Sequence, residues 1–439
     1  MKKKIFGLSL LLVTLFSTQA QLVLTANDAV SIALKNSYDI LVAGNTAAID
    51  KANNTSGNAG MLPTVTVNAT DNMSLYNTKQ TYFNNTQTSS NNARTNSFNS
   101  NVTLNWTLYD GGKMFVTKQK LQEIEALGEL QYKETVLQTV SNVILAYYDV
   151  VKQKQQLSSI NEVINYNLER VKILQTSFNA GNTAKTNLLQ AQIDLNVYNE
   201  NAITQKSVIL DAKKILNQLL SRDINIEFEV TDTIETNYTP NTQDLLQKLY
   251  ANNASIMSLQ KQVDIAKLSL KELQTLYLPR FNFNAGYNYL RSNNAIGNPT
   301  ALKINNSFGP LIGGTLSIPL YQGGNVRRQV SVSSIQLKSS QYGLENAKLA
   351  LYTELINSLT DFEAQRNLLT IEKNNHFLTK ENLDISIQRL RLGETTTLET
   401  KLAQESFQDS LTRLLNFEYN LKVAETKLKQ LLAETDLKL

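Results

Sequence analysis

The sequence contains the same series of elements twice, and this duplication constrains the fold more than any other feature. The stretch "LYDGG", which begins at Leu108, returns as "LYQGG" at Leu320. A Leu-Pro pair ends in Pro63 and again in Pro279, and "FNAGNTAKTNLLQAQ" corresponds to "LRLGETTTLETKLAQ". Because these anchors keep their order at a nearly constant offset, we predict two structural repeats. The predicted ranges are 21–220 for the first repeat, 221–241 for a connector, 242–432 for the second repeat and 433–439 for a C-terminal tail.

Each repeat contains two stretches in which apolar and polar residues alternate, which is the period of a β-strand. Val102, Leu104 and Trp106, for example, alternate with Asn and Thr. We place strand starts at Pro63 and Pro279, because proline suits the first position of a strand. The segments between paired strands are rich in Asn, Thr and Ser, and we expect solvated hairpin loops there. The predicted strand pairs are 62–76 with 101–109, and 279–290 with 312–321.

The rest of each repeat has helical composition. Apolar residues recur at spacings of three and four, as at Val140, Ile144, Tyr147 and Val151. We predict a helix before each strand pair, a long helix after it, on the order of 100 Å, and a shorter helix that returns in an antiparallel coiled coil. The predicted helices are 26–60, 113–178 and 184–220 in the first repeat, and 242–277, 325–392 and 395–432 in the second.

A tyrosine and two glycines stand between each returning strand and its long helix. Glycine supplies the backbone angles that a sharp bend requires, and an amphipathic tyrosine ring suits a membrane interface. We therefore predict two strand-to-helix corners. They consist of Tyr109, Gly111 and Gly112 in the first repeat, and of Tyr321, Gly323 and Gly324 in the second.

The first residues indicate export. Three lysines precede an apolar run that ends at Phe16 and is followed by "STQA", so we predict a signal peptide over 1–20. The alternating strands then have two interpretations: surface hairpins packed on helices, or strands of an outer-membrane barrel whose apolar face meets lipid. Export and the aromatic residues near the strand ends favour the barrel. Because four strands cannot close a barrel, several chains would have to share one.

The composition argues against an enzyme. The chain has no cysteine and one histidine, His376, so it cannot build a thiolate site or a multi-histidine metal site. It contains no glycine-rich phosphate loop. The formal net charge is only +4, and most of it comes from the lysines of the signal peptide, which argues against a nucleic-acid partner. We expect no catalytic activity, no cofactor and no bound metal.

The doubled order of Leu-Pro, strand pair, "LY-x-GG" corner and glycine-marked helical hairpin resembles the TolC family of bacterial outer-membrane efflux proteins, over 26–432. The resemblance implies a mainly α-helical fold with a membrane β-barrel portion. In a homotrimer, four strands per chain would form one twelve-stranded barrel in outer-membrane lipid, and the long helices would form a periplasmic α-barrel.

The resemblance further implies a passive exit duct of a tripartite efflux or type I secretion system. Such a duct lies in the outer membrane, extends into the periplasm, and is coupled to an inner-membrane transporter through a periplasmic adaptor, or membrane fusion protein. The turns at Gly181 and Gly393, with Leu392, would be hairpin tips that contact the adaptor. The alternative is a periplasmic adaptor or coiled-coil scaffold that forms no pore.

Candidate gate residues also follow from the resemblance. Family members carry an arginine four residues before the second tip glycine, and here this is Arg389, with Arg391 following. Some members carry two acidic residues after that glycine, which correspond to Glu399 and to Leu402, so only the first is acidic in this chain. A role in closure or ion selectivity stands beside a simpler interpretation of all three charged residues as solvated groups near helix ends.

Overall fold

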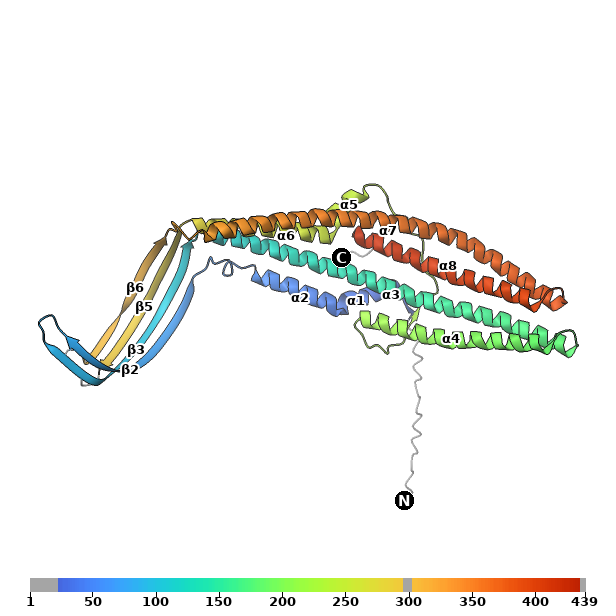
Figure 1. Ribbon diagram of the computed structural model, residues 1–439, viewed down its shortest axis with the longest axis horizontal. Coiled ribbons are helices and arrows are strands. Elements are labelled where there is room, and N and C mark those ends of the chain that lie inside the picture. Colours follow the sequence, from blue (N-terminus) through green and yellow to red (C-terminus); the bar gives the residue numbers. More distant parts are fainter. Residues whose placement is uncertain (1–22, 295–301, 435–439) are drawn as a thin grey trace, which may run out of the picture. The chain divides into compact units, whose positions relative to one another are not determined.

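The structure, a computed structural model, describes residues 23–294 and 302–434 (Figure 1). The predicted signal peptide, 1–20, and most of the predicted tail, from 435 onward, lie outside the described residues. The chain forms two compact units. In its described residues, the hairpin unit comprises 23–41, Thr135–Leu249 and 352–434, and the sheet unit comprises Val42–Glu134, 250–294 and 302–351.

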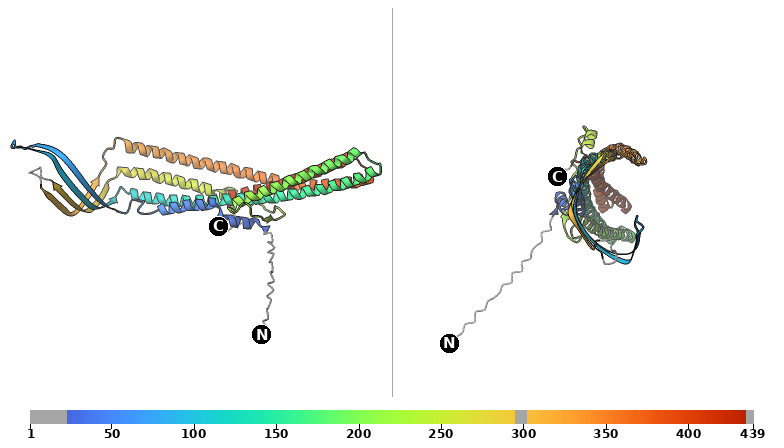
Figure 2. Two further views of the ribbon diagram at one scale, coloured as in Figure 1. Left: turned by 90° about the horizontal axis from the view of Figure 1, so that it is seen from below. Right: turned by 90° about the vertical axis from the view of Figure 1, so that its left-hand side faces the viewer.

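The sheet unit contains a four-stranded antiparallel sheet with the order β2-β3-β5-β6 (Figure 2). Its central pair, β3 with β5, joins the two sequence repeats. The four predicted strands are thus confirmed. The two predicted long helices are confirmed as well, and they extend over Lys113–Asn179 and Asn325–Leu392. The strands are β2 (Thr64–Thr81), β3 (Gln87–Tyr109), β5 (Arg280–Asn294) and β6 (Ile304–Ser317).

The strands of the first repeat are longer than the alternation predicts. The Asn-, Thr- and Ser-rich segment 77–100, expected to be a loop, is mostly strand, because β2 and β3 keep pairing from Thr64 with Asn105 to Thr81 with Gln87. That prediction is wrong for most of the segment, since backbone pairing overrides the loop propensity of single residues. In the second repeat β6 ends earlier than predicted, at Ser317. Pro319, which has no backbone N–H, cannot continue the ladder.

The helices that precede the strand pairs are interrupted. Instead of one helix over 26–60, the chain forms α1 (Ala26–Asn36) and α2 (Tyr38–Asn53), which are separated by the buried Ser37. Instead of one helix over 242–277, it forms α5 (Leu245–Asn252), α6 (Ala254–Gln274) and the 3₁₀ turn η1 (Thr275–Tyr277). Asn253 separates α5 from α6, because its side chain accepts hydrogen bonds from the amides of Ser255 and Ile256 at 3.1 and 3.2 Å and so caps α6.

Within the sheet unit, the first part of α3 (Lys113–Asn179) packs against α6 and α2. Glu272 of α6 accepts a hydrogen bond from Thr117 at 2.9 Å and forms an ion pair with Lys120. Gly128 of α3 lies against Asp50 and Ala47 of α2, where the helices approach closely. These contacts fix the start of α3 immediately beyond the sheet.

Each returning strand meets its long helix at a glycine pair in the left-handed backbone region. The φ angles are 77° and 84° at Gly111 and Gly112, and 62° and 75° at Gly323 and Gly324. In the first corner the Asp110 carboxylate accepts a hydrogen bond from the amide of Met114 at 3.0 Å and caps α3. The corresponding residue in the second corner is Gln322, before α7 (Asn325–Leu392).

In the hairpin unit, α4 (Lys185–Leu219) returns beside α3, and α8 (Thr397–Leu431) returns beside α7 (Figure 1). One core cluster surrounds Tyr147, whose hydroxyl donates to the carbonyl of Leu24 at 2.9 Å. That contact anchors β1 (Val23–Leu24), which pairs in parallel with β4 (Glu229–Val230). A second cluster, which includes Val163 and Phe407, packs the two hairpins against each other. In the described part of the chain, no helix is both long and apolar enough to cross a membrane.

Candidate functional site

The register of the sheet sorts its side chains onto an apolar face and a polar face. On one face Val67, Val102 and Tyr287 stand side by side, because each is paired with the next in the ladder. These three side chains are 71, 44 and 51 % exposed. On the other face Asn68 lies beside Asn101, to whose side-chain oxygen it donates at 3.1 Å. The chain thus leaves an extended apolar face of the sheet uncovered.

Both outer edges of the sheet are open. Among the described residues, β2 pairs only with β3, and β6 pairs only with β5. A long edge strand carries a row of backbone N–H and C=O groups that another strand can pair with. In a lipid environment such groups must be satisfied by hydrogen bonds within the protein. The sheet is therefore incomplete in a single chain.

The two hairpin tips have the same backbone arrangement. The amides of Gly181 and Asn182 donate to the carbonyls of Phe178 and Ser177 at 2.9 and 2.8 Å, and those of Gly393 and Glu394 repeat the pattern at 3.1 and 2.9 Å. This pair of hydrogen bonds satisfies two carbonyls at the C-terminus of each helix. It requires a residue in the left-handed backbone region, and φ is 77° at Gly181 and 75° at Gly393. Leu392, the last residue of α7, is 71 % exposed at its tip.

The structure brings two of the predicted tip residues together. Arg389 donates to the Glu399 carboxylate at 3.0 Å and to the carbonyl of Glu394 at 3.1 Å. Thr395 donates to the other oxygen of Glu399. That hydrogen bond, followed by the charge of Arg389, lowers the pKa of Glu399, so the carboxylate is ionised at neutral pH. The pair places opposite charges side by side on an exposed tip.

Arg391 lies apart from this pair. Its guanidinium contacts the Glu169 carboxylate of α3, so it links the last turn of α7 to the other hairpin. About three turns earlier in α7, Lys380 pairs with Glu162 of α3 at 2.7 Å. Exposed pairs of this kind each contribute little to stability, typically 0–1 kcal/mol in order of magnitude. They are contacts between α7 of one hairpin and α3 of the other.

A buried polar cluster, which the sequence interpretation missed, lies deeper in the same unit. Arg170 of α3, with 3 % of its side chain exposed, forms an ion pair with Asp194 of α4. Its guanidinium also donates to Gln404 of α8 at 3.3 Å. Lys401 of α8 reaches the other oxygen of Asp194 at 3.2 Å. Asp194 therefore connects helices from both hairpins, and we call these four residues the clasp.

The surroundings of Asp194 keep it charged. Burial raises the pKa of this carboxyl, but hydrogen bonds from Gln190 and Arg170 and the nearby positive charges outweigh burial and lower it.

A signal for the clasp is present in the sequence. Val163, Asn167, Arg170 and Leu174 follow a heptad spacing along α3, and all four are buried. Two polar residues in such a stripe indicate a specific polar partner.

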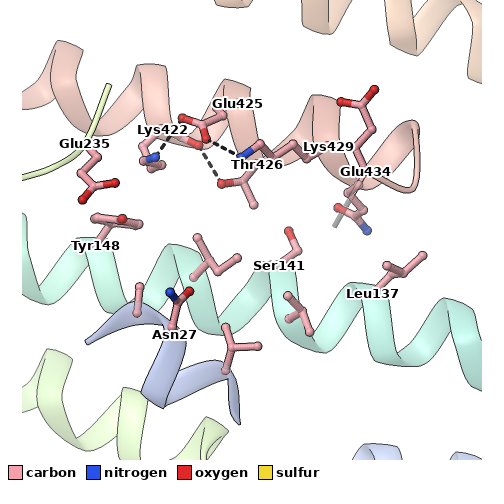
Figure 3. A pocket seen from close by; sticks show the side chains of 15 residues that line it. Asn27, Leu137, Ser141, Tyr148, Glu235, Lys422, Glu425, Thr426, Lys429 and Glu434 are labelled. Carbon is pink, nitrogen blue, oxygen red and sulfur yellow. Dashed lines mark hydrogen bonds and ion pairs between the residues drawn. The ribbon is translucent and has the colours of Figure 1, made fainter. Parts of the chain in front are cut away.

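A cavity of about 280 Å³ lies between α1, α3 and α8 in the hairpin unit (Figure 3). Lys422 and Lys429 both contact the Glu425 carboxylate, at 2.8 and 3.0 Å. Burial, with the charge of Glu235, raises the pKa of Tyr148 beside them to about 12. Two lysines thus neutralise Glu425 in the wall of the cavity. Because α1 and α3 belong to the first repeat and α8 to the second, we interpret the cavity as part of the packing between the two repeats.

The structure offers no metal centre in its described residues, where no group of three or more His, Cys, Asp or Glu could hold an ion. His376 stacks on Phe407, with ring centroids 5.3 Å apart. Burial and the charge of Lys380 lower its pKa. His376 is therefore a neutral residue that packs on Phe407 of the second core cluster.

Comparison with known proteins agrees with this architecture. The family model Outer membrane efflux protein matches residues 29–222 and 245–434, one match per repeat. Outer membrane protein TolC of Vibrio cholerae is 21 % identical over 68 % of this chain and 68 % of its own length. The solved structure of CusC covers 93 % of this chain and 91 % of its own at 16 % identity, with a TM-score of 0.77.

The CmeC outer membrane channel of Campylobacter jejuni has a similar fold, with a TM-score of 0.75 at 17 % identity, over 93 % of this chain and 85 % of CmeC. The resemblance inferred from the doubled motifs is thereby confirmed. The chain belongs to the outer membrane efflux protein family of TolC-like channels, which are not enzymes but efflux channels that lie in the outer membrane and extend into the periplasm.

Proposed function

We propose that three copies of this chain form one continuous duct, in which their sheets close a twelve-stranded barrel. Family membership itself implies a trimer that associates with an efflux pump. The observation that carries the proposal is the pair of open edges, β2 and β6, on a four-stranded sheet. Pairing β6 of one copy with β2 of the next satisfies every edge, whereas four strands alone cannot close around a lumen.

The two faces of the sheet support the same arrangement. Apolar residues occupy alternate positions of β5 from Phe281 to Tyr289. At about 3.3 Å per residue and a tilt of about 40°, this stretch spans roughly 20 Å, close to the lipid-facing band of about 25 Å in outer-membrane barrels. Asp71 and Arg291 follow at the outer end of the same face, where a charge can reach the headgroups. The opposite, polar face would then line the lumen.

The sheet unit and the hairpin unit suggest different partners. The sheet unit would lie in outer-membrane lipid, with Tyr109 and Tyr321 at the corners near the interface. The tips at Gly181, Gly393 and Leu392 would face the periplasm and contact an adaptor protein, which joins the duct to an inner-membrane transporter. The transporter would supply the energy, since this sequence contains no nucleotide-binding loop. This arrangement is a passive exit conduit.

We expect the purified protein to migrate as a heat-sensitive oligomer and to conduct ions in planar lipid bilayers. The physical reason is that the barrel is completed only when the edge strands of neighbouring copies pair. Gel migration with and without heating, together with single-channel recording, measures both properties. A monomer that stays dispersed without detergent and conducts no current would exclude the duct and favour the scaffold alternative.

For the tip, we expect Glu399→Gln to lower the preference of the pore for cations and Arg389→Ala to raise it and loosen the resting closure. Arg389 neutralises Glu399 at 3.0 Å, so its removal exposes one carboxylate per chain, whereas Glu399→Gln removes it. Reversal potentials across a salt gradient measure the preference. The double variant Arg389→Ala with Glu399→Gln is the control and should resemble Glu399→Gln. Unchanged reversal potentials in both single variants would remove these residues from the entrance.

A further inference from the structure

The polar face of the sheet carries almost no charge. In the part of the sheet where all four strands are present, up to the pair Thr95 and Asn294, the charged residues are Asp71, Arg280 and Arg291. Lys79 of β2 and Arg94 of β3 lie beyond this part, where only these two strands pair. Asp71 and Arg291 belong to the rim of the apolar face, because both are in register with Phe98. Arg280 is the first residue of β5, at the end next to the corners. Between Asn282 and Asn294 the polar face therefore has no ionisable side chain.

Amide and hydroxyl groups take the place of charges on this face. They also bond to one another across the strands: Thr66 with Thr103 at 2.9 Å, Thr107 with Asn282 at 3.0 Å and Thr95 with Asn294 at 2.8 Å. A carboxamide offers both donors and acceptors, so it can hydrogen-bond to a cationic, an anionic or a neutral solute. The face members on β3 and β5 are Thr95, Ser97, Asn99, Asn101, Thr103, Asn105, Thr107, Asn282, Asn284, Gly286, Asn288, Leu290, Ser292 and Asn294.

We propose that the four-stranded part of the sheet is an uncharged hydrogen-bonding wall of the duct, which passes cationic, anionic and neutral solutes without electrostatic preference. The inference rests on the proposed function, since it requires the polar face to line the lumen. Rings of ionised side chains determine the sign preference of a pore, and substitutions on the lumen side of a barrel change it. Discrimination by charge is therefore confined to the corner end of the sheet, where Arg280 begins β5, and to the helical part of the duct, where Arg389 and Glu399 lie. The exit section thus admits polar solutes that are cationic, anionic or neutral.

The absence of cysteine from the chain permits a direct test with single introduced thiols. Asn99 is exposed on the polar face, pairs with Thr70 of β2, and accepts substitution by cysteine without loss of an apolar contact. The assembled protein in lipid vesicles is treated with a cationic and an anionic methanethiosulfonate reagent. For Asn99→Cys, we expect the ratio of the two modification rates to match that of a small free thiol within about twofold, because no fixed charge lies nearby.

A second variant shows that the assay detects charge. Thr70→Asp places a carboxylate directly opposite residue 99, with Cβ atoms about 5 Å apart. In the combined variant Thr70→Asp with Asn99→Cys, we expect the rate ratio to shift toward the cationic reagent by about tenfold. A ratio already displaced by tenfold in Asn99→Cys alone would overturn the uncharged wall. A ratio that Thr70→Asp leaves unchanged would overturn the other premise of the proposal, that charge on this face sets the preference for cations or anions.

A third variant separates this inference from the proposed barrel. Val102→Cys lies on the same strand as Asn99 but on the apolar face, which the barrel places in lipid. We expect charged reagents to modify Val102→Cys at least about a hundredfold more slowly than Asn99→Cys, since neither reagent enters hydrocarbon. Equal reaction of the two thiols would contradict the barrel itself. A protected Val102→Cys with an unbalanced ratio at Asn99→Cys would contradict only the uncharged wall.

Discussion

Replacing Asp194 with alanine should weaken the association of α3, α4 and α8 in the hairpin unit by about 3–5 kcal/mol, because it leaves a buried guanidinium without its carboxylate. Arg170 has 3 % of its side chain exposed, and its remaining partner would be the neutral Gln404 at 3.3 Å. Lys401 would also lose its contact with α4. Native-state hydrogen exchange of the α4 amides measures the free energy of local opening.

The matched control is Asp211→Ala on the same helix. Asp211 forms an exposed ion pair with Lys214 at 3.3 Å, and 68 % of its side chain is accessible. Asp211→Ala should therefore lower the free energy of local opening only slightly, by well under about 1 kcal/mol. A double variant, Arg170→Leu with Asp194→Leu, removes both buried charges and should recover most of the stability, because an apolar pair can replace a buried ion pair. Equal effects of Asp194→Ala and Asp211→Ala would show that the clasp is unimportant.

The clasp also bears on how the hairpins move. A rotation of one hairpin away from the other must break the partly buried ion pair of Asp194 with Lys401 and the buried hydrogen bond from Arg170 to Gln404. The tip pairs, by contrast, are exposed and weak: Arg389 with Glu399 lies within one hairpin, and Arg391 with Glu169 lies between the two. Separation of the tips should therefore be easy compared with separation at the level of Asp194.

The features that the sequence predicts are those with a regular period. Alternation along Val102, Leu104 and Trp106 predicts strands because each apolar residue belongs to the same face. The spacing of Val140, Tyr147 and Val151 predicts a helix because all three enter one core. Boundaries depend instead on tertiary partners. The extension of β2 and β3 through a loop-like composition comes from cross-strand pairing, which single-residue preferences do not contain.

The candidate site was predictable in part. The tip glycines carry a local signal, since only a left-handed residue completes the turn after α3 and α7. The pairing of Arg389 with Glu399 joins residues on opposite sides of a turn, and a sequence gives no distance between them. The heptad spacing along α3 indicates that Arg170 is buried, but an arginine at that position has many possible partners. Identifying Asp194 required the packing of three helices.

The two "LY-x-GG" corners, so alike in sequence, should differ strongly when their first glycine is replaced. We expect Gly111→Ala to destabilise the sheet unit by about 2–5 kcal/mol. A left-handed alanine costs about 1–2 kcal/mol, and forced overlap adds about 1–3 kcal/mol. An added Cβ at Gly111 would lie 2.7 Å from both the Thr275 carbonyl oxygen and Leu278 Cβ. The Thr275 carbonyl cannot simply move away, because it accepts a hydrogen bond from the Leu278 amide at 3.0 Å.

The matched variants are Gly112→Ala and Gly323→Ala. Both glycines have a positive φ, 84° and 62°, but an added Cβ meets no atom within 4 Å at either position. Their cost should be the backbone term alone, about 1–2 kcal/mol. Thermal stability of the oligomer, followed by heat-dependent gel migration, compares the three variants in one assay. Equal losses would mean that the corner needs glycine only for its backbone angle, and that the close approach of Thr275 and Leu278 to Gly111 does not restrict the residue there.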